Sequence, residues 1–184
     1  MIDIENMKDA CLLAVSSGEP VKVGCIIKSR TDDIICYGVN SKTKHAEVNA
    51  IESFRGKEFS SLDYVTAYVT KAPCLECAKR LLKSNISRAV FAWPYKANPD
   101  TGEPSKWWDT QKKAMEYLAT YGVTVLLIGI DVRGGIPVVR DETEITAYPT
   151  RKKNLCRYVM QGEGFVEAKL YPSSKRKTEE SYFW

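Results

Sequence analysis

The amino-acid sequence predicts an α/β fold, with helices packed on the faces of a largely parallel sheet. Strand-like runs rich in β-branched residues alternate with segments of helical periodicity over residues 63–130. Parallel strands need crossover connections of a dozen or more residues, and the helical segments are long enough to supply them. The composition, 44% hydrophobic and 27% charged over 184 residues, is typical of one globular domain with an appendage and excludes disorder, collagen and coiled coil.

The first third of the chain predicts a helix, a hairpin and a second helix. Apolar residues recur at helical spacing over residues 3–17, and Gly18 follows as a stop signal. Two β-branched runs, at residues 21–27 and 34–39, are separated by a polar stretch, which predicts an antiparallel hairpin. A further helix is expected over residues 45–55.

Strands and helices then alternate in the middle of the chain. Strands are expected over residues 63–70, 87–93 and 123–130, and the last of these is the most apolar run in the sequence. Helices over residues 74–83 and 105–121 separate these strands. This alternation is the main sign of a parallel sheet.

A loop between residues 93 and 108 is rich in proline, glycine and tryptophan. Long loops in compact domains are usually functional or disordered, and this one follows the carboxyl end of a strand, where α/β sheets bind ligands. We expect it to be a lid. After Asp131 the alternation is lost, and residues 136–140 and 164–171 are candidates for short strands.

The chain divides into a neutral body and a basic extension. The formal net charge of +4 lies wholly in residues 151–184, because residues 1–150 contain equal numbers of basic and acidic side chains. We predict a domain of residues 1–130 that carries the chemistry, followed by a basic C-terminal extension of residues 131–184. We interpret this extension as solvated or in contact with another subunit, and an arm that binds nucleic acid is the alternative.

Nothing in the sequence predicts contact with a membrane. The longest apolar run, Val123 to Ile130, is too short for the roughly 20 residues that a membrane-spanning helix needs. The first 15 residues carry acidic side chains instead of a basic start and an apolar stretch. We therefore expect a cytoplasmic protein whose six cysteines are reduced thiols.

One histidine, one glutamate and two cysteines are the candidates for chemistry. His45 stands two residues before Glu47 at a predicted helix start, and Cys74 and Cys77 stand at i and i+3 in the first turn of the next predicted helix. An imidazole and two thiolates suit zinc, and three protein ligands leave a fourth position for water, as in catalytic sites. The alternative is that these side chains are core residues, or belong to a closed structural zinc site with another cysteine as fourth ligand.

Residues 21–130 resemble the cytidine deaminase superfamily, and most closely its deoxycytidylate (dCMP) deaminase branch. The resemblance rests on the H-x-E and P-C-x-x-C patterns and on the stretches 22–27, 37–40, 45–51, 67–70, 73–79 and 84–91. It implies a three-layer α/β/α sandwich with a mixed five-stranded sheet, and a homo-oligomer. It also implies zinc held by His45, Cys74 and Cys77, with Glu47 moving protons between water, the base and the departing amine.

The resemblance also suggests contacts to the substrate. Asn40 matches an asparagine that contacts the sugar, and Tyr95 matches a position near the bound nucleotide; a turn residue and an exposed lid aromatic are the alternatives. Only residues 41–44 stand where many dCMP deaminases insert a glycine-rich stretch, so control by nucleotide triphosphates is not expected. Phosphate recognition stays unassigned, with four candidate lysines: Lys22, Lys42, Lys44 and Lys96.

The predicted function is therefore the hydrolytic deamination of a cytosine nucleotide, dCMP in the first place, to the uracil nucleotide and ammonia. A second hypothesis is a deaminase acting on a base in single-stranded DNA or RNA, with the Trp-rich loop stacking on bases and the basic extension holding phosphates. A third is a binding module that keeps zinc without turnover, against which the intact Glu47 argues.

Overall fold

A computed structural model describes residues 2–55, 59, 62, 64–92, 107–140, 144–147, 155–161 and 164–171. Its elements follow in this order along the chain: α1 Ile2–Ala14, β1 Gly24–Lys28, β2 Ile34–Val39, α2 Ala46–Ser53, β3 Val65–Val69, α3 Leu75–Lys83, β4 Ile86–Ala92, α4 Trp108–Thr120, β5 Thr124–Ile128, β6 Ile130–Arg133, β7 Ile136–Val139, β8 Glu144–Ala147, β9 Leu155–Gln161 and β10 Gly164–Tyr171. Each helix and strand expected between residues 3 and 128 is present, with ends shifted by a few residues. Within the described ranges, no helix is both long and apolar enough to cross a lipid bilayer.

A mixed sheet forms the centre of the molecule. In the described part of the chain it has eight strands, in the order β10-β9-β8-β5-β4-β3-β1-β2. β3, β4 and β5 run parallel, whereas β1 is antiparallel to both β2 and β3. The five strands β5-β4-β3-β1-β2 are the mixed sheet expected from the family resemblance, and β8 pairs antiparallel with β5 to continue it.

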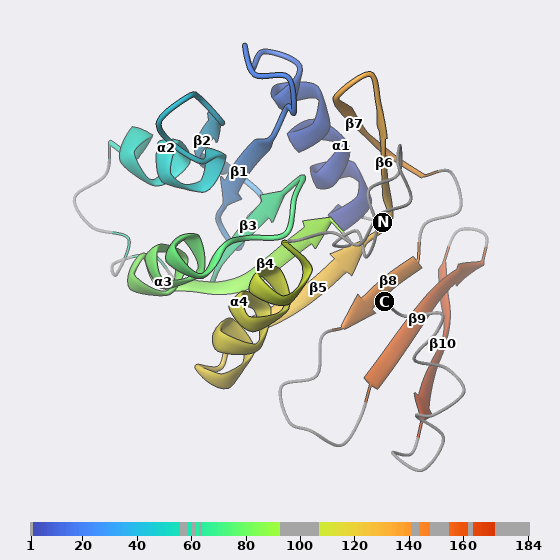
Figure 1. The fold of residues 1–184 in the computed structure, drawn as a ribbon. Coiled ribbons are helices and arrows are strands. Elements are labelled where there is room, and N and C mark those ends of the chain that lie inside the picture. Colours follow the sequence, from blue (N-terminus) through green and yellow to red (C-terminus); the bar gives the residue numbers. More distant parts are fainter. Residues whose placement is uncertain are drawn as a thin grey trace.

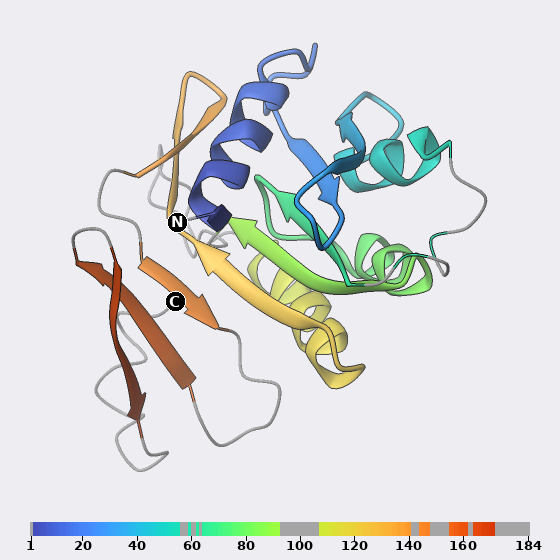
Figure 2. The ribbon, with the colours of Figure 1, turned by 180° about the vertical axis from the view of Figure 1, so that it is seen from behind.

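Helices lie on both faces of this sheet. α2, α3 and α4 cover one face, and α1 lies on the other beside the hairpin formed by β6 and β7 (Figures 1 and 2). Strand side chains alternate between the two layers: Ala67 and Val69 of β3 point into the core beneath α2, α3 and α4, and Tyr68 points into the core beneath α1. This confirms the predicted α/β/α sandwich.

The prediction of a single strand over residues 123–130 is wrong at its C-terminal end. β5 stops at Ile128, and Ile130 begins β6, which pairs with β7 in a separate two-stranded sheet. Gly129 is the point of change, where its carbonyl accepts a hydrogen bond from the Arg140 amide at 3.2 Å. The apolar run is continuous because the end of β5 and Ile130, the first residue of β6, are both buried, although the two strands belong to different sheets.

The C-terminal extension contains more strands than the sequence suggested. β7 and β10 correspond to the two segments expected to be strands, whereas β8 and β9 were not expected. The predicted lid falls mainly on residues 93–106, which lie outside the described residues, and the helix expected from residue 105 begins at Trp108.

α2 packs closely against the hairpin that precedes it. A Cβ added at Gly38 of β2 would collide with the backbone of α2 at Asn49 and Ala50. Asn49 also donates a side-chain hydrogen bond to the Val39 carbonyl at 2.6 Å. The absence of a side chain at Gly38 thus lets β2 fix the position of α2, and with it the position of the residues at the start of that helix.

Candidate active site

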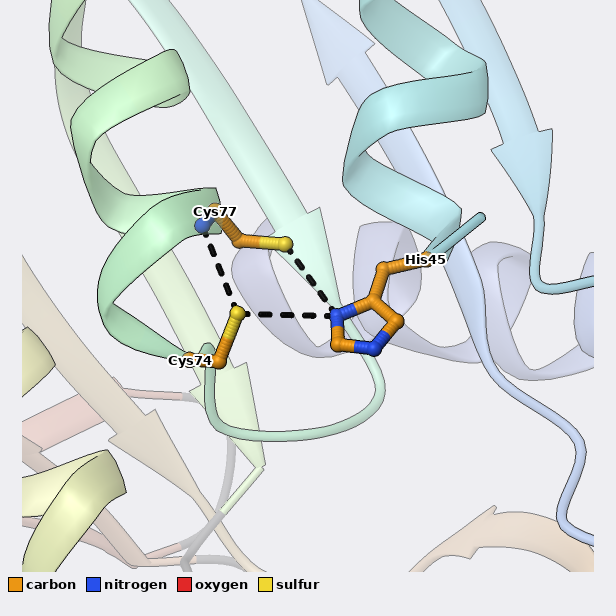
Figure 3. Close-up of side chains that lie close together, drawn as sticks. All are labelled: His45, Cys74 and Cys77. Carbon is orange, nitrogen blue, oxygen red and sulfur yellow. Dashed lines mark hydrogen bonds between the residues drawn. The ribbon is translucent and has the colours of Figure 1, made fainter. Parts of the chain in front are cut away.

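Two helix N-termini meet at one edge of the sheet. β2 and β3 both run antiparallel to β1, so they point in the same direction. α2 follows β2 and α3 follows β3, and therefore both helices begin where these strands end. His45 is the N-cap of α2 and Cys74 is the N-cap of α3. The topology brings His45 and the two cysteines together, although they are distant in sequence (Figure 3).

The three side chains have the geometry of a metal site. His45 Nδ1 lies 3.3 Å from Cys77 Sγ and 3.6 Å from Cys74 Sγ, and all three donor atoms lie within 4.8 Å of one another (Figure 3). Zn–S and Zn–N bonds of ordinary length, at a tetrahedral angle, would hold sulfur and nitrogen about 3.6 Å apart. The residues present therefore fit a zinc ion.

The two thiols differ in acidity before any metal binds. A hydrogen bond from the Cys77 side chain lowers the pKa of Cys74 to about 5, and backbone amides at the start of α3 and the charge of His45 act in the same direction against burial. Donation of this hydrogen bond, together with burial, raises the pKa of Cys77. A bound cation favours the thiolate of both residues, because cysteine ligates metals in its deprotonated form.

Glu47 is a buried acid beside the metal ligands. It lies in the first turn of α2 and only 4% of it is exposed. Burial raises the pKa of its carboxyl and the nearby Cys74 charge adds to the rise, although hydrogen bonds and the charge of His45 oppose it. Among the described residues, no lysine or arginine forms an ion pair with Glu47. A buried carboxyl with a raised pKa, beside a cavity, is a candidate for proton transfer in a reaction.

A cavity of about 220 Å³ opens onto Glu47, His45 and Cys74. Its lining combines apolar side chains with a few polar groups. These residues come from the segment just before β1, from the residues that follow β2 and β3, and from the starts of α2, α3 and α4. The lining residues are Val21, Val23, Asn40, His45, Ala46, Glu47, Lys71, Ala72, Cys74, Trp107, Thr110 and Gln111. The cavity can thus hold a small molecule against the acid and two of the metal ligands, His45 and Cys74.

Residues 2–93, half of the chain, match the family model described as the cytidine and deoxycytidylate deaminase zinc-binding region. The chain belongs to this family of deaminases. The zinc-binding region of the family and the three-ligand cluster together identify zinc as the metal that His45, Cys74 and Cys77 are positioned to bind.

Curated relatives of this deaminase domain act on different substrates. The deoxycytidylate deaminase of Enterobacteria phage T2 is 43% identical over 54 residues, which is 29% of this chain and 28% of the relative. The tRNA-specific adenosine deaminase of Buchnera aphidicola subsp. Baizongia pistaciae is 38% identical over 102 residues, or 49% of this chain and 60% of the relative. The chain thus covers less than two thirds of the length of either protein.

A solved structure supports the deaminase fold. The dCMP deaminase from the cyanophage S-TIM5, in complex with dCMP and dUMP, aligns with a TM-score of 0.52 and 20% sequence identity. The alignment covers 68% of this chain and 96% of the cyanophage chain. Because the identity is low, this likeness concerns the fold.

Asn40 lines the cavity of the deaminase domain, but its side chain is largely engaged with the protein itself. Its Oδ1 accepts hydrogen bonds from the Val23 amide and the Ser17 hydroxyl, both at 2.8 Å, and its Nδ2 donates to the Val21 carbonyl at 2.8 Å. One amide hydrogen is left for another partner. A contact between Asn40 and a sugar stays a prediction.

The candidates for nucleotide and phosphate binding have different outcomes. Tyr95 and Lys96 lie outside the described residues. Lys44 pairs with Glu52 at 2.5 Å, and Lys22 donates to the Ser17 carbonyl, so both ammonium groups have protein partners. Lys42 is exposed and does not line the cavity.

Sequence reasoning missed the residues that α4 and the segment after β3 contribute. Gln111 of α4 is buried, and its Nε2 donates to the Ala72 carbonyl at 3.1 Å, which ties α4 to the segment that leads to Cys74. Lys71 and Trp107 line the same cavity with exposed side chains. The position of Lys71 three residues before Cys74 was an available signal, whereas the approach of α4 depends on tertiary packing.

Proposed function

We propose that this protein is a zinc-dependent hydrolytic deaminase that converts a cytosine nucleotide, dCMP in the first place, to the uracil nucleotide and ammonia. The observation that carries this proposal is Glu47, which is buried, has no cationic partner among the described residues, and lines the same cavity as His45 and Cys74. A purely structural zinc site would need neither a buried acid nor a cavity beside it.

The chain's own residues would hold the metal and move the protons. A zinc ion held by His45, Cys74 and Cys77 would lower the pKa of water from 15.7 toward about 7, which supplies a nucleophile at neutral pH. Glu47 would take a proton from this water and deliver it to the ring nitrogen next to the amino-bearing carbon. The oxygen of this water would bond to the amino-bearing carbon, and Glu47 would take the remaining hydroxyl proton and give it to the amino group as the carbon–nitrogen bond breaks, so that ammonia leaves and a carbonyl remains.

Lys71 is the residue that we assign to the phosphate. Its side chain is exposed on the cavity lining and forms no ion pair with another described residue, in contrast to Lys44. We expect Lys71→Ala to raise KM for dCMP by about tenfold, the loss of one contact to a charged group, and to leave KM for deoxycytidine unchanged. Lys42→Ala, which removes an exposed lysine outside the cavity, is the matched control.

A second candidate is a deaminase that acts on a base within a polynucleotide. Two observations favour it: the similarity to a tRNA-specific adenosine deaminase, and Trp107, which is 55% exposed on the cavity lining. An exposed indole at this position could stack on a base next to the reacting one. This function predicts an affinity for single strands that falls steeply with salt.

Ammonia release by the zinc-loaded protein separates the two candidates. The substrates would be cytidine, deoxycytidine, CMP, dCMP, dCTP, adenosine and single strands containing either cytosine or adenine. Turnover of dCMP with no turnover of strands supports the first function. Turnover of strands alone contradicts it and supports the second.

Assembly and location are part of the same proposal. We infer a homo-oligomer, as the family resemblance implies, and a cytoplasmic location. Light scattering coupled to size-exclusion chromatography tests the assembly, and a mass equal to one chain of 20.7 kDa would contradict it.

A further inference from the structure

The hairpin formed by β6 and β7 lies outside residues 2–93, which match the deaminase family, but it touches a wall of the cavity. The segment Pro20–Val23 forms this wall, because Val21 and Val23 both line the cavity. At the tip of the hairpin, the Gly135 carbonyl accepts a hydrogen bond from the Lys22 amide at 3.0 Å. The hairpin and the wall are therefore in direct backbone contact.

The contact requires a glycine at the tip of the hairpin. Gly135 has a φ of +80°, and a Cβ built on it would collide with the carbonyl oxygen of Pro20. The preceding residue, Gly134, also has a positive φ, of +57°, but a Cβ built on it meets nothing within 4 Å. The two glycines thus share the same kind of backbone, and only Gly135 is pressed against the wall.

The wall is held from two sides. On one side, the Asn40 side chain bonds the Val21 carbonyl and the Val23 amide, each at 2.8 Å. On the other side, Gly135 bonds the amide of Lys22, the residue between them. The base of the hairpin is fixed in turn, because Ile130 and Val139 are buried in the core beneath α1.

We propose that the β6–β7 hairpin is a positioning element for the candidate active site, which holds the Pro20–Val23 wall of the cavity in place through Gly135. The metal ligands and Glu47 lie at the starts of α2 and α3 and not on the wall that Gly135 contacts, so we expect the hairpin to affect the fit of the substrate and not the metal or the proton transfers. The effect on substrate rests on the proposed function, whereas the mechanical contact does not.

The test compares Gly135→Ala with Gly134→Ala, which has a similar backbone strain without the collision. Hydrogen–deuterium exchange of zinc-loaded protein reports on the wall directly. We expect faster exchange at the amides of Lys22 and Val23 in Gly135→Ala only, with the same zinc content in both variants. Equal exchange in the two variants would overturn the proposal.

Steady-state kinetics on dCMP give a second readout. Displacement of the wall should raise KM in Gly135→Ala by about tenfold or more relative to Gly134→Ala, with kcat changed much less. Faster exchange without a change in KM would overturn the role in positioning substrate. Absence of turnover in the unmodified protein would refute the proposed function, and the exchange experiment would still decide whether the hairpin holds the wall.

The unmodified protein gives a measurement that remains valid if Gly135→Ala does not fold. The contact predicts slow exchange at the Lys22 amide, because this amide donates to Gly135. Exchange at the rate of an exposed, unbonded amide would overturn the proposal.

Discussion

Two buried acids occupy equivalent places on opposite faces of the sheet. Asp3 lies in the first turn of α1 and is 8% exposed, and Glu47 lies in the first turn of α2 and is 4% exposed. Asp3 is surrounded by donors: Arg88 Nη1 donates to its Oδ1 at 2.6 Å, Arg88 Nη2 donates to its Oδ2, and the Tyr68 hydroxyl donates at 2.9 Å. Glu47 instead faces two thiols and an imidazole.

The pKa values of these two acids move in opposite directions. Burial alone would raise the pKa of Asp3, but the hydrogen bonds and charge of Arg88 outweigh it and lower the pKa. Burial dominates at Glu47 and raises its pKa. A buried acid with its own cation is kept ionised and paired, whereas a buried acid without one, beside a cavity, is available for chemistry.

The largest expected effect comes from Glu47→Gln, which keeps the shape of the side chain and removes its ability to carry a proton. We expect turnover to fall by about 10²–10⁴-fold or more, with zinc content and thermal stability close to those of the unmodified protein. Ammonia release and elemental analysis measure the two quantities. The control is Glu52→Gln, at an exposed position of the same helix, which should retain turnover. If Glu47→Gln also retained turnover, Glu47 would not be the proton carrier.

Asp3→Ala should affect stability instead of chemistry. It leaves the Arg88 guanidinium, which is mostly buried, without its partner, and we expect a loss of about 2–4 kcal/mol in the free energy of unfolding. Urea denaturation measures this loss, and kcat per zinc-loaded molecule should stay within about twofold. Glu5→Ala breaks the exposed pair with Lys8 and should cost less than about 0.5 kcal/mol. A loss at Asp3 no larger than this would show that the buried pair does not stabilise the fold.

Replacement of both members of the pair sharpens the comparison. Asp3→Leu with Arg88→Met removes both charges from the core beneath α1, so that neither is left buried alone. We expect the double variant to recover at least about half of the stability lost in Asp3→Ala, measured by the same denaturation. The Tyr68 hydroxyl, which loses its acceptor at Asp3, limits the recovery. A double variant less stable than Asp3→Ala would contradict this account.

The smallest effect is a dependence of stability on pH. The folded state lowers the pKa of Asp3 below its ordinary value of 3.8, so its ionised form stabilises the fold above that value, and this contribution is lost as pH falls through the folded pKa. The difference in unfolding free energy between the unmodified protein and Asp3→Asn should therefore be constant from pH 7 to about 5 and decrease below about pH 4. Urea titrations at several pH values test this, and a difference that grows on acidification would have the wrong sign.

Local sequence patterns predicted much of the fold and the metal site. The 3.6-residue and two-residue periodicities gave the helices and strands up to Ile128, and the H-x-E and C-x-x-C spacings placed His45, Cys74 and Cys77 at helix starts, where the structure has them. These features depend on neighbours within about one turn of helix or one strand pair.

Features that depend on distant contacts were not predicted. The break at Gly129 interrupts an apolar run whose two halves are both buried, so composition gave no sign of it. The β8 and β9 strands were missed in the extension, and β8 is placed by its pairing with the edge of β5. Likewise, Gln111 joins the site only because α4 packs next to α3.

The core beneath α1 also bears on how the chain folds during synthesis. Met7 and Cys11 leave the ribosome early, but they share their core with Val139, which follows some 130 residues later. At ordinary rates of translation this interval lasts roughly 6–25 s. During that time part of the apolar face of α1 stays exposed to solvent, and a chaperone that recognises nascent chains can bind it.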